Sequence, residues 1–574
     1  MLSFPLSLPP NLTIALLMRT AHQSYALNGG REVRLWLSVH CDAFRADPIA
    51  YLIACWWRLR GKRVRARGQF ARLLGGSVHA YALWMLWHEE PMHVSGDDPD
   101  APPILALVDA RGAGEGAVAA SMDSLAAEGM AALVFVPNAM RPPAAADHKS
   151  TLADVAERID WAGEPWLLPI AAGDTIAAGA ARAYRAAIAA AGGTDGAAGA
   201  RIIYADDDLA GPSGRRTSPH FKPDWNSELF RHHDYLTGAC ILRTTREALL
   251  AHATAPDWAA QLVAGEAGKG VPAHIHKVLH HRRTRPAPQV PPVARSVTTG
   301  LPPVTIVIPT RNRVDLLRTC LAGIAATDYP AAVEVIVVDN DSDDPATLAY
   351  LAGLDPARYR VLRHAGPFNY SAINNRAVAE ARGRLLCLLN NDIEVIEPHW
   401  LATMALQAVR AEVGAVGARL LYPDGRIQHA GVVTGMGGAA GHAHRLLHPD
   451  EEGYFRRHAL PQFISAVTAA CLLVEREKFL AVGGLNESRF AVAFNDVDLC
   501  LRLHQRGWQS LYEPRATLVH HESVSRGLDR DPVGAARFAG ELAALKERWG
   551  TEGGSDPFHH PELSRASERF AVRL

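Results

Sequence analysis

This 574-residue sequence has almost no net charge, few cysteines and no paired Cys-x-x-Cys motif. Its 59 Lys and Arg residues balance 60 Asp and Glu residues, which leaves a formal net charge of -1. Because a nucleic-acid partner usually requires a basic field, this balance does not favour one. The seven cysteines are scattered and odd in number, which indicates free thiols in a reducing, cytoplasmic compartment.

The sequence also lacks the long apolar runs that mark membrane-spanning proteins. No uninterrupted apolar stretch reaches the roughly 20 residues that a spanning helix requires. The apolar residues at the start follow no Lys or Arg, and Pro5, Pro9 and Pro10 interrupt them, so we expect no signal peptide. The expected protein is soluble or peripheral to a membrane.

Length and composition predict several domains, because 574 residues exceed what one hydrophobic core usually holds. The composition becomes rich in Ala, Gly and Asp near residue 98, and a Pro-rich stretch follows near residue 286. The expected parts are a helical N-terminal region over 1–97, an α/β domain over 98–285, a Pro-rich linker over 286–302, a second α/β domain over 303–550 and a C-terminal tail over 551–574.

Within the N-terminal region, residues 54–67 combine Trp56 and Trp57 with a run of Lys and Arg residues. Two interpretations stay open. The stretch has the composition of a helix that docks on an anionic membrane surface. It equally fits a solvated basic helix face that packs against the rest of the protein.

Four polar clusters mark the second α/β domain. Three follow short apolar runs that read as buried strands, at 304–308, 333–338 and 385–389, and helical patterns lie between them. This alternation predicts a parallel sheet. Ligands of such sheets bind outside the carboxyl ends of the strands, so the three clusters predict one site. The clusters are Pro309-Thr310-Arg311-Asn312, Asp339-Asn340-Asp341-Ser342 and Asn390-Asn391-Asp392, with Asn495-Asp496-Val497-Asp498 as the fourth.

Six motifs over residues 304–527 together resemble glycosyltransferase family 2. They are Pro-Thr-Arg-Asn-Arg, Val-Asp-Asn-Asp-Ser, Leu-Asn-Asn-Asp-Ile-Glu-Val, Gly-Gly-Leu-Asn-Glu, Phe-Asn-Asp-Val-Asp-Leu-Cys-Leu-Arg and His-His-Glu-Ser-Val-Ser-Arg-Gly. The resemblance is to the rhamnosyltransferase-like and O-antigen-like branch. It implies an α/β fold class with two GT-A (Rossmann-like) domains, mainly parallel sheets and a preceding helical region.

The resemblance also implies a reaction and the residues that perform it. Asp496 resembles the base that takes the proton of the acceptor hydroxyl in an inverting transfer. Asp392 and His521 are expected at a divalent metal, Mg2+ or Mn2+, that neutralises the leaving diphosphate. The residues expected to bind the nucleotide-sugar are Pro309, Thr310, Asn312, Asp339, Asn340, Ser342 and Asn391. The expected supporting residues are Asn390, Asn495, Asp498 and His520.

Two of these positions depart from the family pattern, and several have simpler interpretations. Asn390 stands where the family's Asp-x-Asp motif begins, and Asn495 stands where Glu often precedes the base. As alternatives, Asp392 fits a turn or a helix cap, and Asp339 with Ser342 fits an Asx-type turn. The two histidines also fit ordinary core or surface positions.

Residues 100–285 resemble a second, divergent copy of the same family. The resemblance rests on Tyr204-Ala-Asp-Asp-Asp208 and on segments near residues 221, 234 and 274. Asp206 and Asp208 would then mimic the metal motif, while no base appears between Arg243 and Pro272. We expect a degenerate domain that supports, orients or binds saccharide. A second active site and a solvent-exposed acidic turn remain the alternatives.

The sequence therefore predicts a metal-dependent glycosyltransferase of cell-surface polysaccharide or O-antigen biosynthesis. Its expected partners are a nucleotide-diphosphate sugar, a saccharide or lipid-linked acceptor, and the inner face of the cell membrane as a peripheral contact. A non-catalytic glycan-binding or scaffold protein is one rival. A sugar-nucleotidyltransferase is another, although Thr310 to Arg313 lacks the glycine that its phosphate loop needs.

Overall fold

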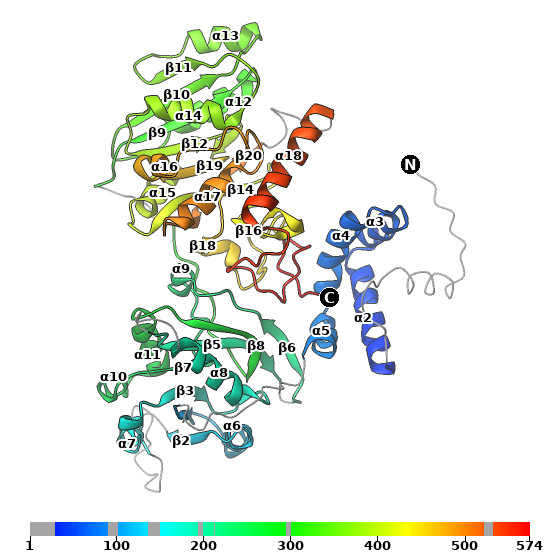
Figure 1. Cartoon of the computed structure of the whole chain (residues 1–574), viewed down its shortest axis with the longest axis vertical. Helices are drawn as coiled ribbons and strands as arrows, with labels where there is room; N and C mark the ends of the chain where they lie inside the picture. Colours follow the sequence, from blue (N-terminus) through cyan, green and yellow to red (C-terminus); the bar gives the residue numbers. More distant parts are fainter. Residues whose placement is uncertain are drawn as a thin grey trace.

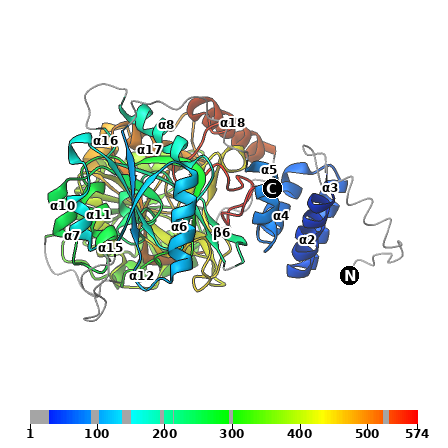
Figure 2. The same cartoon turned by 90° about the horizontal axis from the view of Figure 1, so that it is seen from below.

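The structure, a computed structural model, describes residues 29–89, 102–135, 150–192, 199–211, 213–293, 300–521 and 532–574. Two α/β bodies lie one above the other along the longest axis of the molecule, and a group of helices stands to one side of them (Figure 1, Figure 2). The last residues of the chain run between these three parts.

The N-terminal helices are α2 (Gly30–Ala46), α3 (Pro48–Leu59), α4 (Arg63–Gly75) and α5 (Ala80–His88). They pack through small apolar clusters, one of which joins Trp36 and Val39 to Leu83. None of the helices in the described parts of the chain is both long and apolar enough to cross a membrane. The helical N-terminal region expected from the sequence is thus confirmed.

The first α/β body contains one sheet, whose strands follow the order β2-β1-β3-β7-β5-β8-β4, with β6 paired to β5. The strands are β1 (Ile104–Asp109), β2 (Ala131–Phe135), β3 (Trp166–Ala171), β4 (Thr175–Ile176), β5 (Ile202–Ala210), β6 (Arg216–His220), β7 (Cys240–Leu242) and β8 (Ala273–Arg282). The helices are α6 (Glu115–Ala127), α7 (Leu152–Glu157), α8 (Ala180–Gly192), α9 (Ser227–Phe230), α10 (Arg246–Ala251) and α11 (Trp258–Ala267).

The second α/β body contains a larger sheet in the order β11-β10-β9-β12-β19-β14-β20-β13, with β15 paired to β14 and β18 to β20. Its strands are β9 (Val304–Thr310), β10 (Val333–Asp339), β11 (Tyr359–Arg363), β12 (Leu385–Leu389), β13 (Ile393–Val395), β14 (Val413–Leu421), β15 (Ile427–His429), β18 (Gln462–Ile464), β19 (Cys471–Glu475) and β20 (Gln509–His520). Strands β16 (Val432–Thr434) and β17 (Ala440–His442) pair separately. The helices are α12 (Val314–Ala325), α13 (Pro345–Ala352), α14 (Tyr370–Glu380), α15 (Trp400–Ala408), α16 (Arg476–Ala481), α17 (Asn495–Gln505) and α18 (Pro532–Trp549).

The two sheets share one topology. Reading β10-β9-β12-β19-β14-β20-β13 against β2-β1-β3-β7-β5-β8-β4 gives the same order and, at each step, the same parallel or antiparallel pairing. The α/β class is therefore confirmed. Each sheet is mixed, because β7 and β19 run against both of their neighbours and interrupt the parallel strands.

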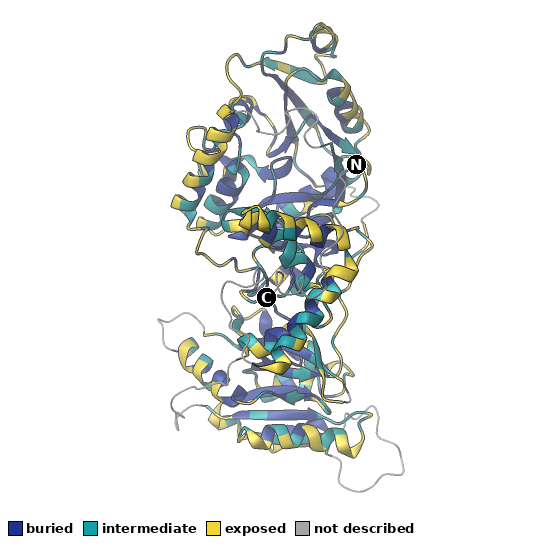
Figure 3. Cartoon of the chain, turned by 90° about the vertical axis from the view of Figure 1, so that its right-hand side faces the viewer, coloured by how far each residue is buried: buried dark blue, intermediate teal, exposed yellow. Residues whose placement is uncertain are grey.

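The apolar runs of the sequence form the centre of the second sheet. Every residue of β9 and of β12 is buried, as expected for strands covered on both faces (Figure 3). Helix α12 covers one face with Leu317, Cys320 and Ile324. These strands hold their carboxyl ends at one edge of the body.

One glycine marks how closely this core is packed. A Cβ added to Gly417 on β14 would lie 2.4 Å from Cβ of Val467, so a side chain there forces the core apart. We expect Gly417→Ala to lower the free energy of unfolding by about 1–3 kcal/mol. Gly116 in α6 has open space around it, so Gly116→Ala should leave stability unchanged or raise it by up to about 1 kcal/mol. Thermal or denaturant unfolding measures both, and equal effects would contradict the packing argument.

Candidate active site

The carboxyl ends of β9, β10 and β12 bring the first three polar clusters together. Thr310 ends β9 and lies beside Asp339, the last residue of β10. Asn391, which follows β12, donates from Nδ2 to Oγ1 of Thr310 over 3.0 Å. Thr310, Asp339 and Asn391 are all buried, as is Pro309 one residue before. Residues far apart in the sequence therefore form one polar edge.

Loop hydrogen bonds make this edge rigid. The backbone N–H of Ser342 donates to Oδ1 of Asp339, which is the Asx-type turn weighed for these residues. The backbone N–H of Asn312 donates to Oγ of Ser342 over 2.9 Å. Asn340 donates from Nδ2 to the carbonyls of His364 and Gly366. Turn formation thus uses Oδ1 of Asp339 and leaves Oδ2 facing the exposed Arg363, 3.0 Å away.

Asp392 is buried near two histidines whose imidazoles face different carboxylates. Nε2 of His520 lies 3.0 Å from Oδ1 of Asp392, and Nδ1 of His520 lies 2.7 Å from Oε1 of Gln428. The imidazole of His521 instead lies 2.8 Å from Oε2 of Glu394. The sequence expectation gave His521 the metal and His520 a supporting place, whereas the imidazole of His520 lies against the Asp392 carboxylate and His521 reaches Asp392 through its backbone N–H.

A pocket of about 360 Å³ opens beside Asp392. Asp392, Glu394, His521 and Asp315 contribute carboxylate oxygens and an imidazole to its lining. Such oxygen-rich donors suit a hard divalent cation, so the residues fit one. Among the described residues, Asp392 belongs to no close group of three ligands, and an ion here would take its remaining ligands from phosphate and water. Sequence reasoning missed Glu394, although its spacing of two from Asp392 was a signal.

Asp496 lies close to the same edge, at the start of α17. Its Oδ2 accepts a hydrogen bond from the backbone N–H of Ala469 over 3.0 Å, and the next residue, Ala470, accepts one from the backbone N–H of Asn390. Burial raises the pKa of Asp496 above its ordinary value, against the lowering effect of the N–H groups of Ala469 and Val497. The carboxylate is thus oriented, partly exposed and easier to protonate than usual.

The neighbours of Asp496 are structural. Asn495 is buried and donates to the carbonyl of Val492. Asp498 is fully buried, pairs with Arg502 and accepts from Nε1 of Trp549, which ties α17 to α18. Sequence reasoning missed Glu541 of α18, whose carboxylate accepts from the backbone N–H groups of Val492 and Ala493 and so fixes the loop before Asp496.

The matching edge of the first sheet is closed by aromatic side chains. The shared topology puts Asp109, Phe135 and Asp174 where the second sheet has Thr310, Asp339 and Asp392. Trp258, the first residue of α11, is buried there, and its Nε1 lies 3.3 Å from Oδ2 of Asp109. Its ring meets Phe135 edge to face at 5.4 Å. A nucleotide would find this edge filled.

The expectation that Asp206 and Asp208 occupy the position of the metal motif in the first domain is wrong. They lie within β5, the counterpart of β14, and not after β3, where the counterpart of the metal motif is Ala172-Gly173-Asp174. Nor do they form an exposed turn, since both are fully buried. The sequence pattern could not reveal this buried position, because three consecutive aspartates give the same pattern at the end of a strand and inside a buried strand.

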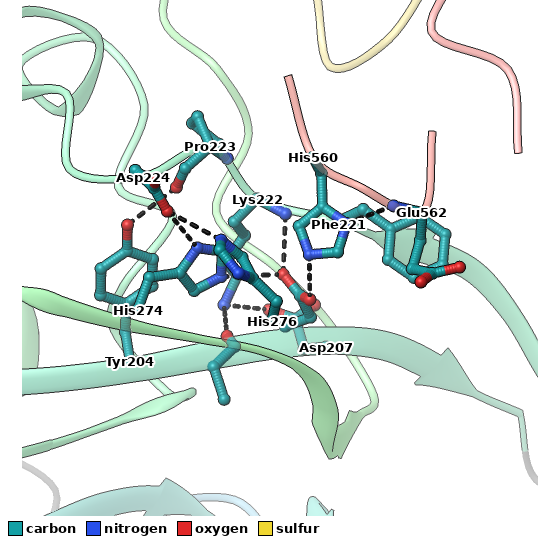
Figure 4. Close-up of polar contacts among 12 residues, drawn as sticks. Tyr204, Asp207, Phe221, Lys222, Pro223, Asp224, His274, His276, His560 and Glu562 are labelled. Carbon is teal, nitrogen blue, oxygen red and sulfur yellow. Dashed lines mark hydrogen bonds and ion pairs between the residues drawn. The ribbon is translucent and has the colours of Figure 1, made fainter. Parts of the chain in front are cut away.

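Each aspartate of the triplet instead meets a basic group of the protein. Nζ of Lys222 lies 2.8 Å from Oδ2 of Asp207, and Nε of Arg216 lies 2.5 Å from Oδ2 of Asp208. His560, from the C-terminal tail, points into this group beside His276 (Figure 4), and its Nε2 lies 2.8 Å from Oδ2 of Asp206. Burial would raise the pKa of Asp206, but His560 and His274 outweigh it and hold that pKa below its ordinary range.

Three histidines gather around Asp206, with one ring nitrogen each of His274, His276 and His560 within 4.8 Å of the others. Both ring nitrogens of His274 face carboxylates, those of Asp206 and Asp224, each at 3.1 Å. Nδ1 of His560 accepts from the backbone N–H of Glu562, which leaves the proton of a neutral ring on the side of Asp206. These imidazoles and carboxylates form a polar network that attaches the tail to the first domain.

Comparison with known proteins identifies part of the chain. Residues 305–474 match the sequence model of Glycosyl transferase family 2. The chain is 40% identical over 419 residues to the uncharacterized protein y4gI of Sinorhizobium fredii, covering 65% of this chain and 46% of that protein. It is 36% identical over 417 residues to the O-antigen biosynthesis protein RfbC of Myxococcus xanthus, covering 65% of this chain and 32% of that protein.

A third relative is shorter. The chain is 28% identical over 240 residues to an N-acetylglucosaminyl-diphospho-decaprenol L-rhamnosyltransferase of Mycobacterium tuberculosis, covering 38% of this chain and 75% of that protein. The chain spans less than half the length of the two relatives given first.

The buried triplet generates a stability prediction. Changing Asp206 and Asp208 together to Ala removes the partners of His560 and Arg216 inside the protein, so we expect a loss of at least about 3 kcal/mol in the free energy of unfolding. Asp450 is a surface control, because its side chain is 92% exposed, and Asp450→Ala should change stability by less than about 0.5 kcal/mol. Chemical denaturation compares the two. A double variant as stable as the wild type would show that the triplet does not hold the fold.

Proposed function

We propose, from the premise that residues 305–474 belong to glycosyl transferase family 2, that this chain transfers a sugar from a nucleotide-diphosphate sugar to a saccharide or lipid-linked acceptor. The observation that carries the proposal is the meeting of Thr310, Asp339, Asp392 and Asp496 at one edge of the second sheet. The proposed product is a cell-surface polysaccharide or O-antigen-like glycan, and the likeness to RfbC supports it.

The nucleotide would bind across the ends of β9 and β10. Oδ2 of Asp339 and the hydroxyl of Thr310 offer hydrogen-bond acceptors to ribose or base. Asn312, Asn340 and Ser342 hold the loops in place, and their short side chains leave the edge open. Pro309 and Asn391 complete the contacts proposed for the donor.

A divalent metal, Mg2+ or Mn2+, would be held by Asp392, with Glu394 and His521 facing the same pocket. When bound, the ion neutralises the charge of the leaving diphosphate. His520 fixes the carboxylate of Asp392 through its contact with Oδ1, and Asn390 lies 3.4 Å from the same imidazole. Asn390 adds no charge, which makes Asp392 the central anionic ligand.

Asp496 would act as the general base of an inverting transfer. An acceptor hydroxyl that attacks the anomeric carbon opposite the diphosphate must lose its proton, and the carboxylate of Asp496 receives it. The N–H of Ala469 orients this carboxylate. Its raised pKa brings it closer to the working pH, where a base and its conjugate acid both exchange protons efficiently.

We further infer that the first α/β body is a second copy whose donor site has been lost. The shared strand order supports common ancestry, and Trp258 with Phe135 fills the edge where a nucleotide would lie. The first residues of α11, Trp258-Ala259-Ala260, provide no base, and the preceding Asp257 is exposed and accepts a hydrogen bond from Nε2 of Gln261. The chain would then have one catalytic centre and act in the cytoplasm, at the inner face of the cell membrane.

Asp392 and its topological counterpart Asp174 form a matched pair of variants. Asp392→Asn should abolish metal-dependent binding of a nucleoside diphosphate, because it removes the central anionic ligand. Asp174→Asn changes the same chemistry in the closed site, where Asp174 accepts from the backbone N–H of Arg283, and should leave that binding unchanged. Calorimetric titration with Mn2+ measures both. Equal losses, or none in Asp392→Asn, would move the metal site elsewhere.

Asp496 generates the pH prediction. A base acts only when ionised, so transfer should fall as the pH drops through a pKa that lies above the ordinary 3.8 of an aspartate. Asp496→Asn should remove this acid limb and lower turnover by about 100-fold or more, with donor affinity nearly intact. Steady-state kinetics and donor titration separate the two effects. Loss of donor affinity together with turnover would make Asp496 a binding residue.

A further inference from the structure

Helix α3 exposes a continuous apolar stripe at the outer end of the helical region. Ile49, Leu52, Ile53 and Trp56 follow a spacing of i, i+3, i+4 and i+7, so they share one face of the helix. Their exposed fractions are 73%, 56%, 39% and 49%, and Leu59 at the end of the helix is 62% exposed. The opposite face already packs inward through Ala50, Tyr51 and Ala54. The outer stripe is therefore not needed for the local core.

A basic rim follows this stripe directly. Residues 54–67 contain six Lys or Arg residues and no acidic residue. Within the described parts of the chain none of these six forms an ion pair, and Lys62, Arg63, Arg65 and Arg67 are exposed. The guanidinium of Arg60 lies 4.8 Å from the ring centre of Trp56, so cation and aromatic surface meet. The positive charge is concentrated beside the apolar side chains.

The position of the stripe leaves it accessible. Helices α2 and α3 lie on the side of the helical group that faces away from both α/β bodies (Figure 1, Figure 2). Helix α5, on the inner side, attaches the group to the rest of the molecule, because Tyr81 donates to Asp208 and Trp84 donates to Glu562. The group is thus fixed at its inner end and exposed at α3.

We propose that α3 and the start of α4 dock on an anionic lipid surface. The apolar stripe would enter the boundary between headgroups and acyl chains, Trp56 would lie at headgroup level, and the cations of residues 58–67 would pair with lipid phosphates. Each cation near such a surface adds to the attraction, so the rim and the stripe act together. The transferase would then work beside the membrane that carries a lipid-linked acceptor.

The role of this membrane contact in sugar transfer rests on the proposed function. The contact itself does not depend on it. Vesicle binding is measured on the full chain without donor, metal or acceptor. A transferase that ignores lipid, or a lipid-binding chain without transfer, would therefore separate the two proposals.

The test is co-sedimentation with vesicles rich in phosphatidylglycerol and, in parallel, with neutral phosphatidylcholine vesicles. The chain should bind the anionic vesicles and release them as salt is raised, since screening weakens the charged contacts. The double change Leu52→Glu and Trp56→Glu should lower binding at least about tenfold, as should Arg63→Glu with Arg65→Glu. Val271→Glu is the matched control, because Val271 is 72% exposed on a loop of the first domain. It should bind like the wild type.

Circular dichroism and melting establish that the variants remain folded, as expected for changes at exposed positions. Three results would overturn the proposal. They are absence of binding to anionic vesicles, equal binding by the stripe variants and the control, and a smaller molecular size of the Leu52→Glu and Trp56→Glu variant in solution. The last result would identify a second copy of the chain as the occupant. Binding that appears only after removal of residues 1–28 would assign the face to that segment instead.

Discussion

Burial of three consecutive carboxylates on β5 is the constraint on which the arrangement of the chain depends. Asp206, Asp207 and Asp208 are each fully buried, and a carboxylate in that position is stable only beside a cation or strong donor. The partners come from different regions: His560 from the tail, Lys222 from the first domain itself, and Tyr81 from helix α5. One strand therefore links the N-terminal helices, the first domain and the C-terminal tail, which also share an apolar cluster through Tyr81, Phe221 and Phe558.

The two sheets combine one strand topology with different residues at the strand ends. Strand order and direction agree throughout, yet the residues at the strand ends differ in kind. The second sheet ends in Thr310 and Asp339, which leave a polar edge, while the first ends in Asp109 and Phe135, which pack against Trp258. The same strand order accommodates either set, and in the first body Phe135 and Trp258 join the buried core. The residues at the strand ends, and not the fold, decide which ligand such an edge can hold.

Sequence periodicity predicted the structural features that depend on residues close together in the sequence. The strands before Thr310, Asp339 and Asn390, and the convergence of their ends, follow from apolar runs and from the geometry of parallel sheets. Sequence periodicity could not predict contacts between residues that are far apart in the sequence. The correspondence of Asp174 with Asp392 needed the strand order, and the contact of His520 with Asp392 needed the register of β20 on β13. Asp206 was misassigned because its partner His560 is 354 residues away.

The same separation has a consequence for biosynthesis. A ribosome adds residues at about 5–20 per second, so His560 emerges roughly 20–70 s after Asp206. Throughout that interval Asp206 has His274 of its own domain beside it but lacks the imidazole of His560. Until residue 560 emerges, the nascent domain must keep the oxygen that later faces His560 hydrated or protonated, and its final packing is deferred. Maturation of the first domain is thus timed by the arrival of a histidine that lies beyond the whole second domain.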